Sequence, residues 1–416
     1  MDRLLTRLCG WLLLTIGQYG FGQTALTWQE IRARFEASNP SLRAAQLNVE
    51  ESRAQEITAF LRPNPGLTAS VDQIDPFTTN PYRPLTSALP FGSLSYLHER
   101  QHKRELRLES AKQGTEITTS LGNDAKRTLL FNLRTAFVQT LQEKAVLNLA
   151  KENLGYYDHV LDVNRERYKA GAIAQVDLDR LELQRVTYES DLQTAEVNLR
   201  TAKIQLLNLL NDRTPVEQFD VTGPFDFTSL VAPLDEVRQA ALDTRPDLQA
   251  ALESIDKAKT DHRLAVANGS TDPIFTLDFA RNPPIPVYFG TGIVIPLRIF
   301  DRNQGEKLRT KLDIDRSQRI TEATRAQVFS DVDSAYATVN ATVTLLQPYK
   351  DRYLKQAERV RDTISFSYQH GAASLLAFLD AQAGYRSVQV SYLNLVASYL
   401  QAANQLNLAV GREVIP

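Results

Sequence analysis

The sequence predicts a mainly α-helical protein with a small β part, built from two copies of one layout. In each half, a proline turn and a helix precede a short β-like stretch, and a very long helical hairpin follows. The turns of the two hairpins share a Tyr-x-x-Gly-Ala motif. Its members are Tyr168, Gly171 and Ala172 in the first copy and Tyr368, Gly371 and Ala372 in the second. An internal repeat of this kind decides the architecture before any single site does.

The composition fits a globular protein without nucleic-acid partners. The chain has 416 residues and a net charge of −2, with 43% hydrophobic and 23% charged residues. Near-neutral charge provides no basic field for nucleic acid. No run of about 18 apolar residues is present, so no transmembrane helix is predicted.

Residues 1–22 have the pattern of a secretory signal peptide. Arg3 and Arg7 precede a short apolar core, and small residues allow cleavage before Gln23. A hydrophobic tail on a cytosolic protein is the alternative. Cys9 is the only cysteine, and it lies too early to resemble a lipoprotein acylation site. A mature chain without cysteine excludes disulfides.

The second helix of each hairpin carries a heptad seam. Apolar residues recur at spacings of three and four from Leu178 to Leu209, with one break at Arg185, and in the same register from Phe378 to Ala409. Such spacing is typical of left-handed coiled coils. Any two such helices can be slid into register, but the shared turn motif argues against coincidence. The helices before the turns are about 65–70 residues and about 100 Å long, so they must pack as a rod, bundle or tube.

Four short segments are predicted to be β-strands. Residues 67–74 and 274–279 alternate apolar and polar side chains, and returning strands are expected at 88–97 and 287–297. Their length of about eight to ten residues is near the height of a membrane apolar band, although soluble hairpins on the helices are an alternative. Four strands cannot close a barrel, and open edges in lipid leave backbone groups unpaired. Membrane strands would therefore require several chains, and three would give about 12 strands.

These patterns divide the chain into nine segments. They are a signal peptide at 1–22, a first helix at 23–66, a first β-hairpin at 67–97, a first long helical hairpin at 98–211 with its tip near 168–177, a linker at 212–233, a second helix at 234–272, a second β-hairpin at 273–298, a second long helical hairpin at 299–411 with its tip near 368–379, and a tail at 412–416.

The string His98-Glu99-Arg100-Gln101-His102 matches the H-E-x-x-H pattern of zinc proteases. We do not assign it a metal, because the basic residues within and after it would repel a cation. The remaining histidines, His159, His262 and His370, have no ligand spacing. No catalytic triad, phosphate loop or carboxylate pair stands out. The sequence therefore predicts no enzyme, no bound metal and no cofactor.

The order of these segments resembles the TolC-type outer-membrane efflux proteins over essentially the whole mature chain. Leu-Arg-Pro-Asn-Pro at 61–65 is similar to the heavy-metal-efflux (CzcC/CusC-like) subgroup. Pro-Leu-Arg-Ile-Phe-Asp-Arg-Asn-Gln-Gly at 296–305 is similar to the family's strand-to-helix junction. That junction usually has Pro-Leu-Pro, and Arg298 replaces its second proline.

The resemblance implies a homotrimer in the outer membrane that extends into the periplasm. A shared 12-stranded β-barrel would cross the lipid, and a trimeric α-barrel would form the periplasmic tube, with 212–233 in an equatorial belt. The tips would meet a periplasmic adaptor, a membrane fusion protein, bound to an inner-membrane pump of the RND type. Heavy-metal cations are one candidate cargo. The alternative function is a periplasmic or surface coiled-coil scaffold without transport.

The resemblance also suggests which residues carry function. The six residues of the Tyr-x-x-Gly-Ala motifs would form the adaptor-facing end, although glycine there also satisfies ordinary turn chemistry. Asp177, Asp179 and Asp380 lie just past the tips. In a trimer, each inward carboxylate would become a ring of three that favours cations. Solvated helix charge is the alternative for these acids.

Overall fold

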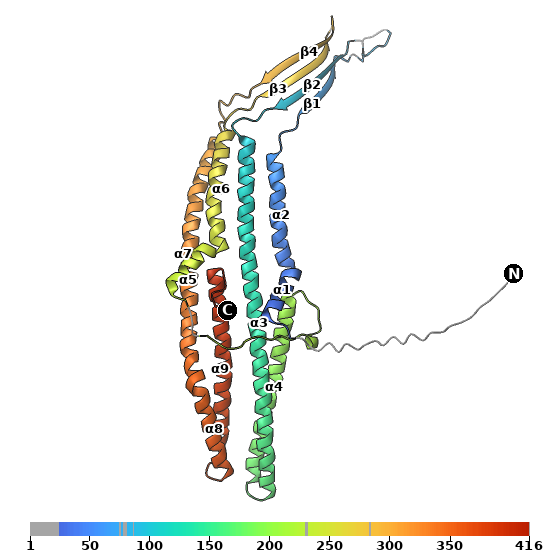
Figure 1. Ribbon diagram of the computed structural model, residues 1–416. Coiled ribbons are helices and arrows are strands. Elements are labelled where there is room, and N and C mark those ends of the chain that lie inside the picture. Colours follow the sequence, from blue (N-terminus) through green and yellow to red (C-terminus); the bar gives the residue numbers. More distant parts are fainter. Residues whose placement is uncertain are drawn as a thin grey trace, which may run out of the picture.

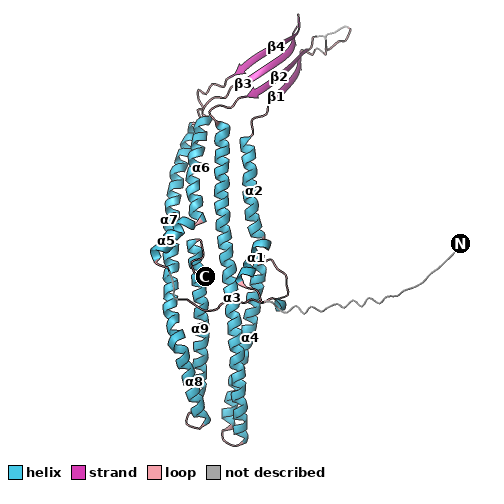
Figure 2. Ribbon diagram, in the orientation of Figure 1, coloured by secondary structure: helices cyan, strands magenta, loops and turns pink. Residues whose placement is uncertain are grey.

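The protein is an elongated column of helices with a sheet at one end and two hairpin turns at the other (Figure 1). The computed structural model describes residues 25–74, 76–77, 81–85, 87–228, 232–282 and 284–415. The expected signal peptide lies outside this range. Figure 2 confirms the predicted fold class, which is mainly α with a small β part.

The elements follow the same order in both halves. The first half contains α1 (Trp28–Ser38), α2 (Pro40–Phe60), β1 (Gly66–Asp72), β2 (Leu89–Leu97), α3 (Lys103–Lys169), α4 (Gln175–Leu209) and a 3₁₀ turn (Val216–Gln218). The second half contains α5 (Leu234–Thr244), α6 (Pro246–Asn268), β3 (Ile274–Asn282), β4 (Ile285–Val294), α7 (Gln304–Pro348), a π-helical turn (Tyr349–Tyr353), α8 (Leu354–Gln369) and α9 (Leu375–Val410).

The segments 23–66 and 234–272 were each expected to hold one helix after a proline turn; the turn is present in each, but a further helix precedes it, which corrects the prediction. The breaks fall at Asn39 and Arg245, whose backbones are extended. Each precedes a proline, and a proline disfavours helical geometry in the residue before it. Asn39 also caps α2, because its side-chain oxygen accepts the N–H of Leu42 at 3.0 Å. Each proline therefore begins a second helix.

The long helix expected before the second tip, within 299–411, is also interrupted. α7 ends at Pro348, and the π-helical turn Tyr349–Tyr353 leads into α8. Proline has no N–H for the helical ladder, so the regular bonding pattern changes there. Lys350 in this turn pairs with Asp226 at 2.8 Å and lies 4.9 Å from the centre of the Phe227 ring. The connection between the two halves therefore holds the interruption in place.

The last strand lies earlier than predicted. β4 occupies Ile285–Val294 instead of 287–297. It begins where Ile285 pairs with Asn282 and ends where Val294 pairs with Ile274, the first residue of β3. The partner strand thus limits β4, and alternation in the sequence could not show this limit.

The four strands and the helices below them are arranged in the same lateral order. The antiparallel sheet has the order β1-β2-β3-β4. Beneath it α2, α3, α6 and α7 pack in sequence, and towards the turns the order is α4, α3, α9 and α8 (Figure 1). The chain is therefore a wall four elements wide. We call the side formed by β1, α2 and α4 the first edge, and the side formed by β4, α7 and α8 the second edge.

The wall changes its packing chemistry along its length. Apolar clusters fill the middle and the region near the turns. Between the sheet and the middle, hydroxyl groups bond carboxylates of neighbouring helices. These bonds join Ser110 to Asp261, Thr115 to Glu56 at 2.6 Å, and Ser120 to Glu253 at 2.8 Å. Small side chains and paired polar groups thus allow close helix contact without a wide apolar core.

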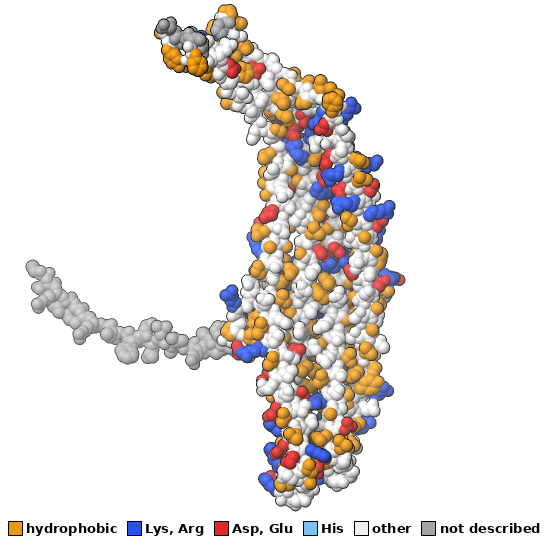
Figure 3. Space-filling view, turned by 180° about the vertical axis from the view of Figure 1, so that it is seen from behind, with side chains coloured by type: hydrophobic (Ala, Val, Ile, Leu, Met, Phe, Trp, Pro, Cys, Tyr) orange, Lys and Arg blue, Asp and Glu red, His pale blue; other side chains and the backbone are white. Residues whose placement is uncertain are grey.

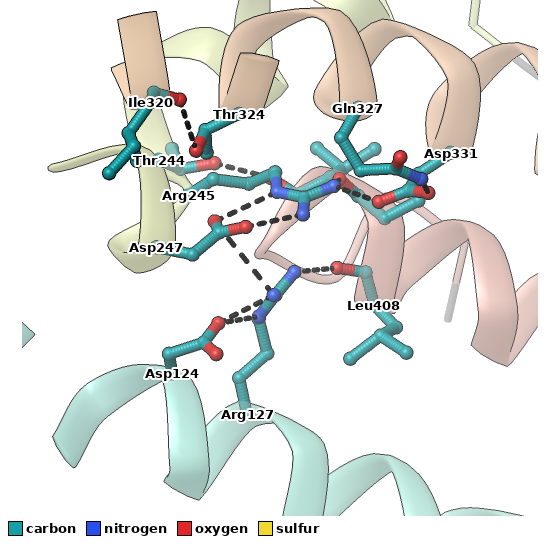
Figure 4. Close-up of polar contacts among 12 residues, drawn as sticks. Asp124, Arg127, Thr244, Arg245, Asp247, Ile320, Thr324, Gln327, Asp331 and Leu408 are labelled. Atoms are coloured by element: carbon teal, nitrogen blue, oxygen red, sulfur yellow. Dashed lines mark hydrogen bonds and ion pairs between the residues drawn. The ribbon is translucent and has the colours of Figure 1, made fainter. Parts of the chain in front are cut away.

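A buried arginine joins three helices in the middle of the wall (Figure 4). The Arg245 side chain is 5% exposed and donates to Asp247 at 2.6 Å and to Asp331 of α7 at 2.8 Å. It also donates to the carbonyl of Ala409 near the end of α9 at 3.3 Å. Burial alone would raise the pKa of Asp247, but Arg245 holds that pKa below its ordinary value. The carboxylate therefore stays charged at neutral pH.

A second arginine connects this junction to α3. Arg127 donates to Asp124 at 2.5 Å, bonds the carbonyl of Leu408, and lies 3.9 Å from Asp247 (Figure 4). Cations at the carbonyl end of a helix interact favourably with its dipole. The end of α9 is thus held by two guanidinium groups from different helices.

Replacing Arg245 by methionine should lower the free energy of unfolding by about 3–5 kcal/mol, because removal of one partner leaves partly buried carboxylates uncompensated. Thermal unfolding would record this as a lower Tm. Arg238→Met is the matched control, since Arg238 pairs with Asp333 of α7 at 2.7 Å on the surface and should change Tm little. Equal shifts in the two variants would contradict the role assigned to Arg245.

Candidate functional site

The two helical turns lie together at the end of the column opposite the sheet (Figure 1). Gly171 and Gly371 have φ values of 73° and 78°. The N–H of Ala172 bonds the carbonyl of Arg167 at 2.8 Å, and Ala372 does the same to Ser367 at 2.8 Å. This is the usual glycine ending of a helix. Nothing lies within 4 Å of a Cβ added at either glycine, so backbone conformation, not space, requires glycine there.

The two tyrosines of the repeated motif have different surroundings. Tyr168 is 39% exposed, whereas Tyr368 is 6% exposed. The Tyr368 ring stacks on Phe378 with centroids 4.8 Å apart, and its hydroxyl donates to Asn164 of α3 at 3.1 Å. Burial raises the pKa of the Tyr368 hydroxyl, which keeps it a neutral donor. Tyr368 therefore joins the two hairpins, while Tyr168 remains at the surface.

Tyr368 belongs to an apolar group that we call the tip cluster. Its buried members are Tyr157, Val160, Leu161, Leu178, Leu181, Tyr188, Tyr368, Leu375 and Phe378. They come from α3, α4, α8 and α9. The tip cluster thus sets the position of both turns relative to one another.

The three acidic residues past the turns, Asp177, Asp179 and Asp380, do not share a common partner in the described part of the chain. Asp177 is half-buried in the first turn of α4, and Asp179 and Asp380 are exposed. Asp179 accepts a hydrogen bond from Gln175 at 2.7 Å. Within the ranges that the structure describes, none of the three forms an ion pair. A gating role for these acids stays a prediction.

Sequence reasoning missed the polar contacts between the two hairpins. Arg386 of α9 pairs with Asp191 of α4 at 2.8 Å, and its guanidinium lies 4.8 Å from the centre of the Tyr188 ring. These side chains border a groove of about 400 Å³ between the hairpins. The heptad pattern of each helix gave no signal of this contact, because the partner lies on the other hairpin.

The His98–His102 string does not lie on a helix. Gln101 and His102 have φ values of 60° and 56°, and α3 begins only after them. Glu99 is paired with Arg107. The two histidines therefore lack the helical spacing that the protease pattern requires. Among the residues described, no group of three or more His, Cys, Asp or Glu side chains is placed to hold a metal ion.

Residues around this string instead fix the sheet to the helices. Lys103 is 3% exposed, and its ammonium group bonds Asp272 at 2.6 Å and the carbonyl of Ser270 at 3.0 Å. The other oxygen of Asp272 accepts the N–H of Arg100 at 2.9 Å. A buried charge needs such pairing. The joint between α3 and β3 is thus fixed by one carboxylate.

The sheet has one apolar face and one polar face. Phe275, Leu277 and Phe279 of β3 are exposed, and the paired register places Leu94 and Phe289 on the same face. The other face is more polar in its middle. Its polar members are Thr68, Ser70, Ser93, Ser95, Thr276 and Asp278, with Ser93 donating to Asp278 at 2.5 Å, and the register also places Phe91 and Tyr288 on this face, both opposite Ala280. None of the described helices has a stretch long and apolar enough to cross a bilayer.

The comparisons with known proteins agree with this geometry. Residues 285–412 match the family described as "Outer membrane efflux protein". Over these residues the chain resembles the outer membrane efflux proteins, the family that the order of its segments predicts. This match and the relatives described next agree on a location in the outer membrane that extends into the periplasm.

Two curated relatives are similar along most of their length. The cobalt-zinc-cadmium resistance protein CzcC of Cupriavidus metallidurans is 23% identical, over 90% of this chain and 87% of that protein. The outer membrane protein TolC of Escherichia coli is 23% identical, over 98% of this chain and 86% of TolC. Neither name denotes an enzyme.

Two solved structures share the fold. The alignment with CusC has a TM-score of 0.79 at 19% identity and covers 92% of each chain. The outer-membrane channel OprN gives a TM-score of 0.75 at 16% identity and covers 92% of this chain and 89% of that one. The wall of helices with a short sheet at one end is therefore the fold of known outer-membrane channels.

Replacing Tyr368 by phenylalanine should destabilise the tip cluster by about 1 kcal/mol, because the buried oxygen of Asn164 loses its shorter donor and keeps only the Arg167 guanidinium at 3.5 Å. Hydrogen exchange of α8 and the end of α3 should become faster. Tyr168→Phe, which removes a hydroxyl from an exposed ring, should leave exchange unchanged. A similar effect of both substitutions would show that the Tyr368 hydroxyl does not join the hairpins.

Proposed function

We propose that three copies of this chain close edge to edge into an export duct, the outer-membrane channel of a tripartite efflux system. The observation that carries this proposal is that the wall has two open edges along its whole length. β1 and β4 each have a single ladder neighbour in the described sheet, and α4 and α8 lie at the borders of the helical layer.

The sheet makes closure a requirement in a membrane. Unpaired backbone groups of β1 and β4 would lie in hydrocarbon, where no water is available to bond them. The first edge of one copy and the second edge of the next form a heterologous contact, and such contacts generate rings. Three copies supply about 12 strands, an even number within the known range of outer-membrane barrels.

The helices at both edges have exposed apolar side chains. On α4, Val176, Leu183, Val197 and Ile204 follow heptad spacing and are 56%, 71%, 61% and 50% exposed. We call this set the α4 stripe. On the second edge the exposed apolar residues include Leu308 and Leu312 of α7 and Val360 and Phe366 of α8. Exposed apolar side chains on opposite edges favour a contact between copies.

The two faces of the sheet support the direction of closure. The apolar face suits lipid, and the face with Ser93, Thr276 and Asp278 suits a water-filled lumen. In this arrangement 212–233, together with α1 and α5, forms an equatorial belt around the tube. The turns at Gly171 and Gly371 then form the end that meets a periplasmic adaptor and, through it, an inner-membrane pump.

Heavy-metal cations are the cargo that we propose, because the name of the relative CzcC denotes cobalt, zinc and cadmium resistance. The chain has one cysteine and one methionine, Cys9 and Met1, and both lie in the expected signal peptide. Soft sulfur ligands that could relay a metal along the wall are therefore not supplied by the mature chain. The duct would conduct ions that the pump delivers.

Reconstitution of the purified protein tests the duct directly. Light scattering should give the mass of three chains, and planar bilayers should show discrete conductance steps. A monomer that remains in the soluble periplasmic fraction would favour the coiled-coil scaffold. Deletion of the gene for this chain should raise the metal sensitivity of the cell if cations are the cargo.

Glutamate substitutions in the α4 stripe should prevent assembly. In L183E/V197E, two carboxylates would be buried between copies without partners, and we expect the dissociation constant between copies to rise at least about 100-fold. The control Q205E adds a carboxylate at an exposed position about a quarter-turn from Ile204 of the stripe, and it should leave the dissociation constant unchanged. Native mass spectrometry measures both. Normal trimers of L183E/V197E would exclude α4 from the contact.

The tips should respond to backbone conformation. Gly171→Val and Gly371→Val should abolish efflux while the trimer still forms, because a β-branched residue does not adopt the positive φ of these turns. Asparagine tolerates this conformation, so Gly171→Asn and Gly371→Asn should retain export. Growth of cells under pump substrate measures the effect. Unchanged export in both valine variants would count against a docking role for the tips.

A further inference from the structure

The segment between β4 and α7 exposes large apolar side chains. Leu297 is 77% exposed, Ile299 60% and Phe300 90%. The flanks of this segment are fixed by the fold. Thr271 donates to the carbonyl of Pro296 at 3.1 Å, and the Asn303 side chain donates to the carbonyl of Ala265 at 2.8 Å. The apolar side chains are thus exposed on an anchored segment. We call residues 296–302 the collar segment.

Two arginines in the collar segment lack acidic partners. Arg298 and Arg302 are exposed, and within the described parts of the chain neither guanidinium forms an ion pair. The next arginines along α7 behave differently. Arg309 pairs with Glu306, and Arg316 pairs with Asp313, each one turn back on the helix. Two free guanidinium groups therefore lie beside three exposed apolar side chains within the collar segment.

The collar segment lies at the height where lipid headgroups are expected. β3 and β4 have 9 and 10 residues. When tilted, strands of this length span an apolar band about 25 Å tall. The collar segment begins just beyond the end of β4. Figure 3 shows hydrophobic side chains gathered at the junction of sheet and helices, with basic side chains directly below.

We propose that the collar segment binds phospholipid headgroups of the periplasmic leaflet, an inference that rests on the proposed duct. Leu297, Ile299 and Phe300 enter the boundary of the acyl chains, as apolar residues do at membrane interfaces. Arg298 and Arg302 donate to lipid phosphates, since guanidinium matches phosphate in a two-pronged geometry. Arg298 stands where the resembling family usually has proline, so this donor is a property of the present chain.

A second copy of the chain is the competing occupant of this surface. Because β4 is an edge strand, the collar segment would approach residues 61–65, which precede β1 of a neighbour. That stretch, Leu-Arg-Pro-Asn-Pro, has no carboxylate and contributes a further arginine, Arg62. It offers no anion to Arg298 or Arg302. Charge therefore favours lipid phosphate over the neighbouring copy.

Titration of the assembled full-length protein with a fluorescent phosphatidylglycerol tests the headgroup contact. In R298Q/R302Q the Kd should rise about 30-fold, since each basic residue near an anionic surface contributes roughly fivefold. The matched control R309Q/R316Q removes the same charge from paired arginines and should leave the Kd unchanged. An unchanged Kd in R298Q/R302Q, or an equal rise in both variants, overturns the proposal.

Depth quenching distinguishes lipid from a second copy. The F300W variant is placed in phosphatidylethanolamine–phosphatidylglycerol vesicles whose acyl chains are brominated near the headgroup. The protein is used without residues 1–22, which contain Trp11, so the native tryptophan is Trp28; it lies in α1 at mid-column and provides an unquenched background. Strong additional quenching in F300W supports the lipid contact. If F300W inserts into the vesicles but is not quenched, the surface contacts a neighbouring copy, and only the proposal of headgroup binding is overturned. Wild-type protein that does not insert overturns the duct and the collar together.

Discussion

The backbone of two edge strands constrains the whole molecule. β1 and β4 can be satisfied in lipid only by strands of other chains, and the sheet is continuous with the helices below it. The helices therefore follow the lateral order of the strands, α2 beneath β1 and α7 beneath β4. A wall that is open at its top must be open along its length, and both edges carry apolar residues that one chain leaves in water.

Polar contacts determine the positions of many helices in this wall. Arg245 and Arg127 hold the end of α9 against three other helices, and Lys103 with Asp272 fixes the sheet on α3. Hydroxyl–carboxylate bonds join the helices between these two levels. A tube with a wide lumen cannot use one thick apolar core, so paired charges and short polar side chains determine helix position instead.

Much of the fold could be predicted from the sequence because it depends on the spacing of apolar residues and on the glycines and prolines that end helices. The heptads from Leu178 and Phe378, the alternation at 274–279 and the glycines at 171 and 371 each report a local conformation. The proline turns at Asn39 and Arg245 were predicted, but the helices before them, α1 and α5, were missed, because a proline can either open the first helix or separate two helices. Asp191 and Arg386 were missed as a pair because each lies on a different hairpin. No local pattern reports which helices become neighbours, and the end of β4 was set by its partner strand.

The two copies of the Tyr-x-x-Gly-Ala motif are alike in sequence and unlike in chemistry. Tyr368 is used inside the protein and Tyr168 is left outside. A ring of three chains would therefore have six turns of two alternating kinds, with threefold and not sixfold symmetry at its end. A partner that attaches as six identical copies would meet two environments. Such a partner needs either two binding modes or a binding surface that makes no contact with the tyrosine of the motif.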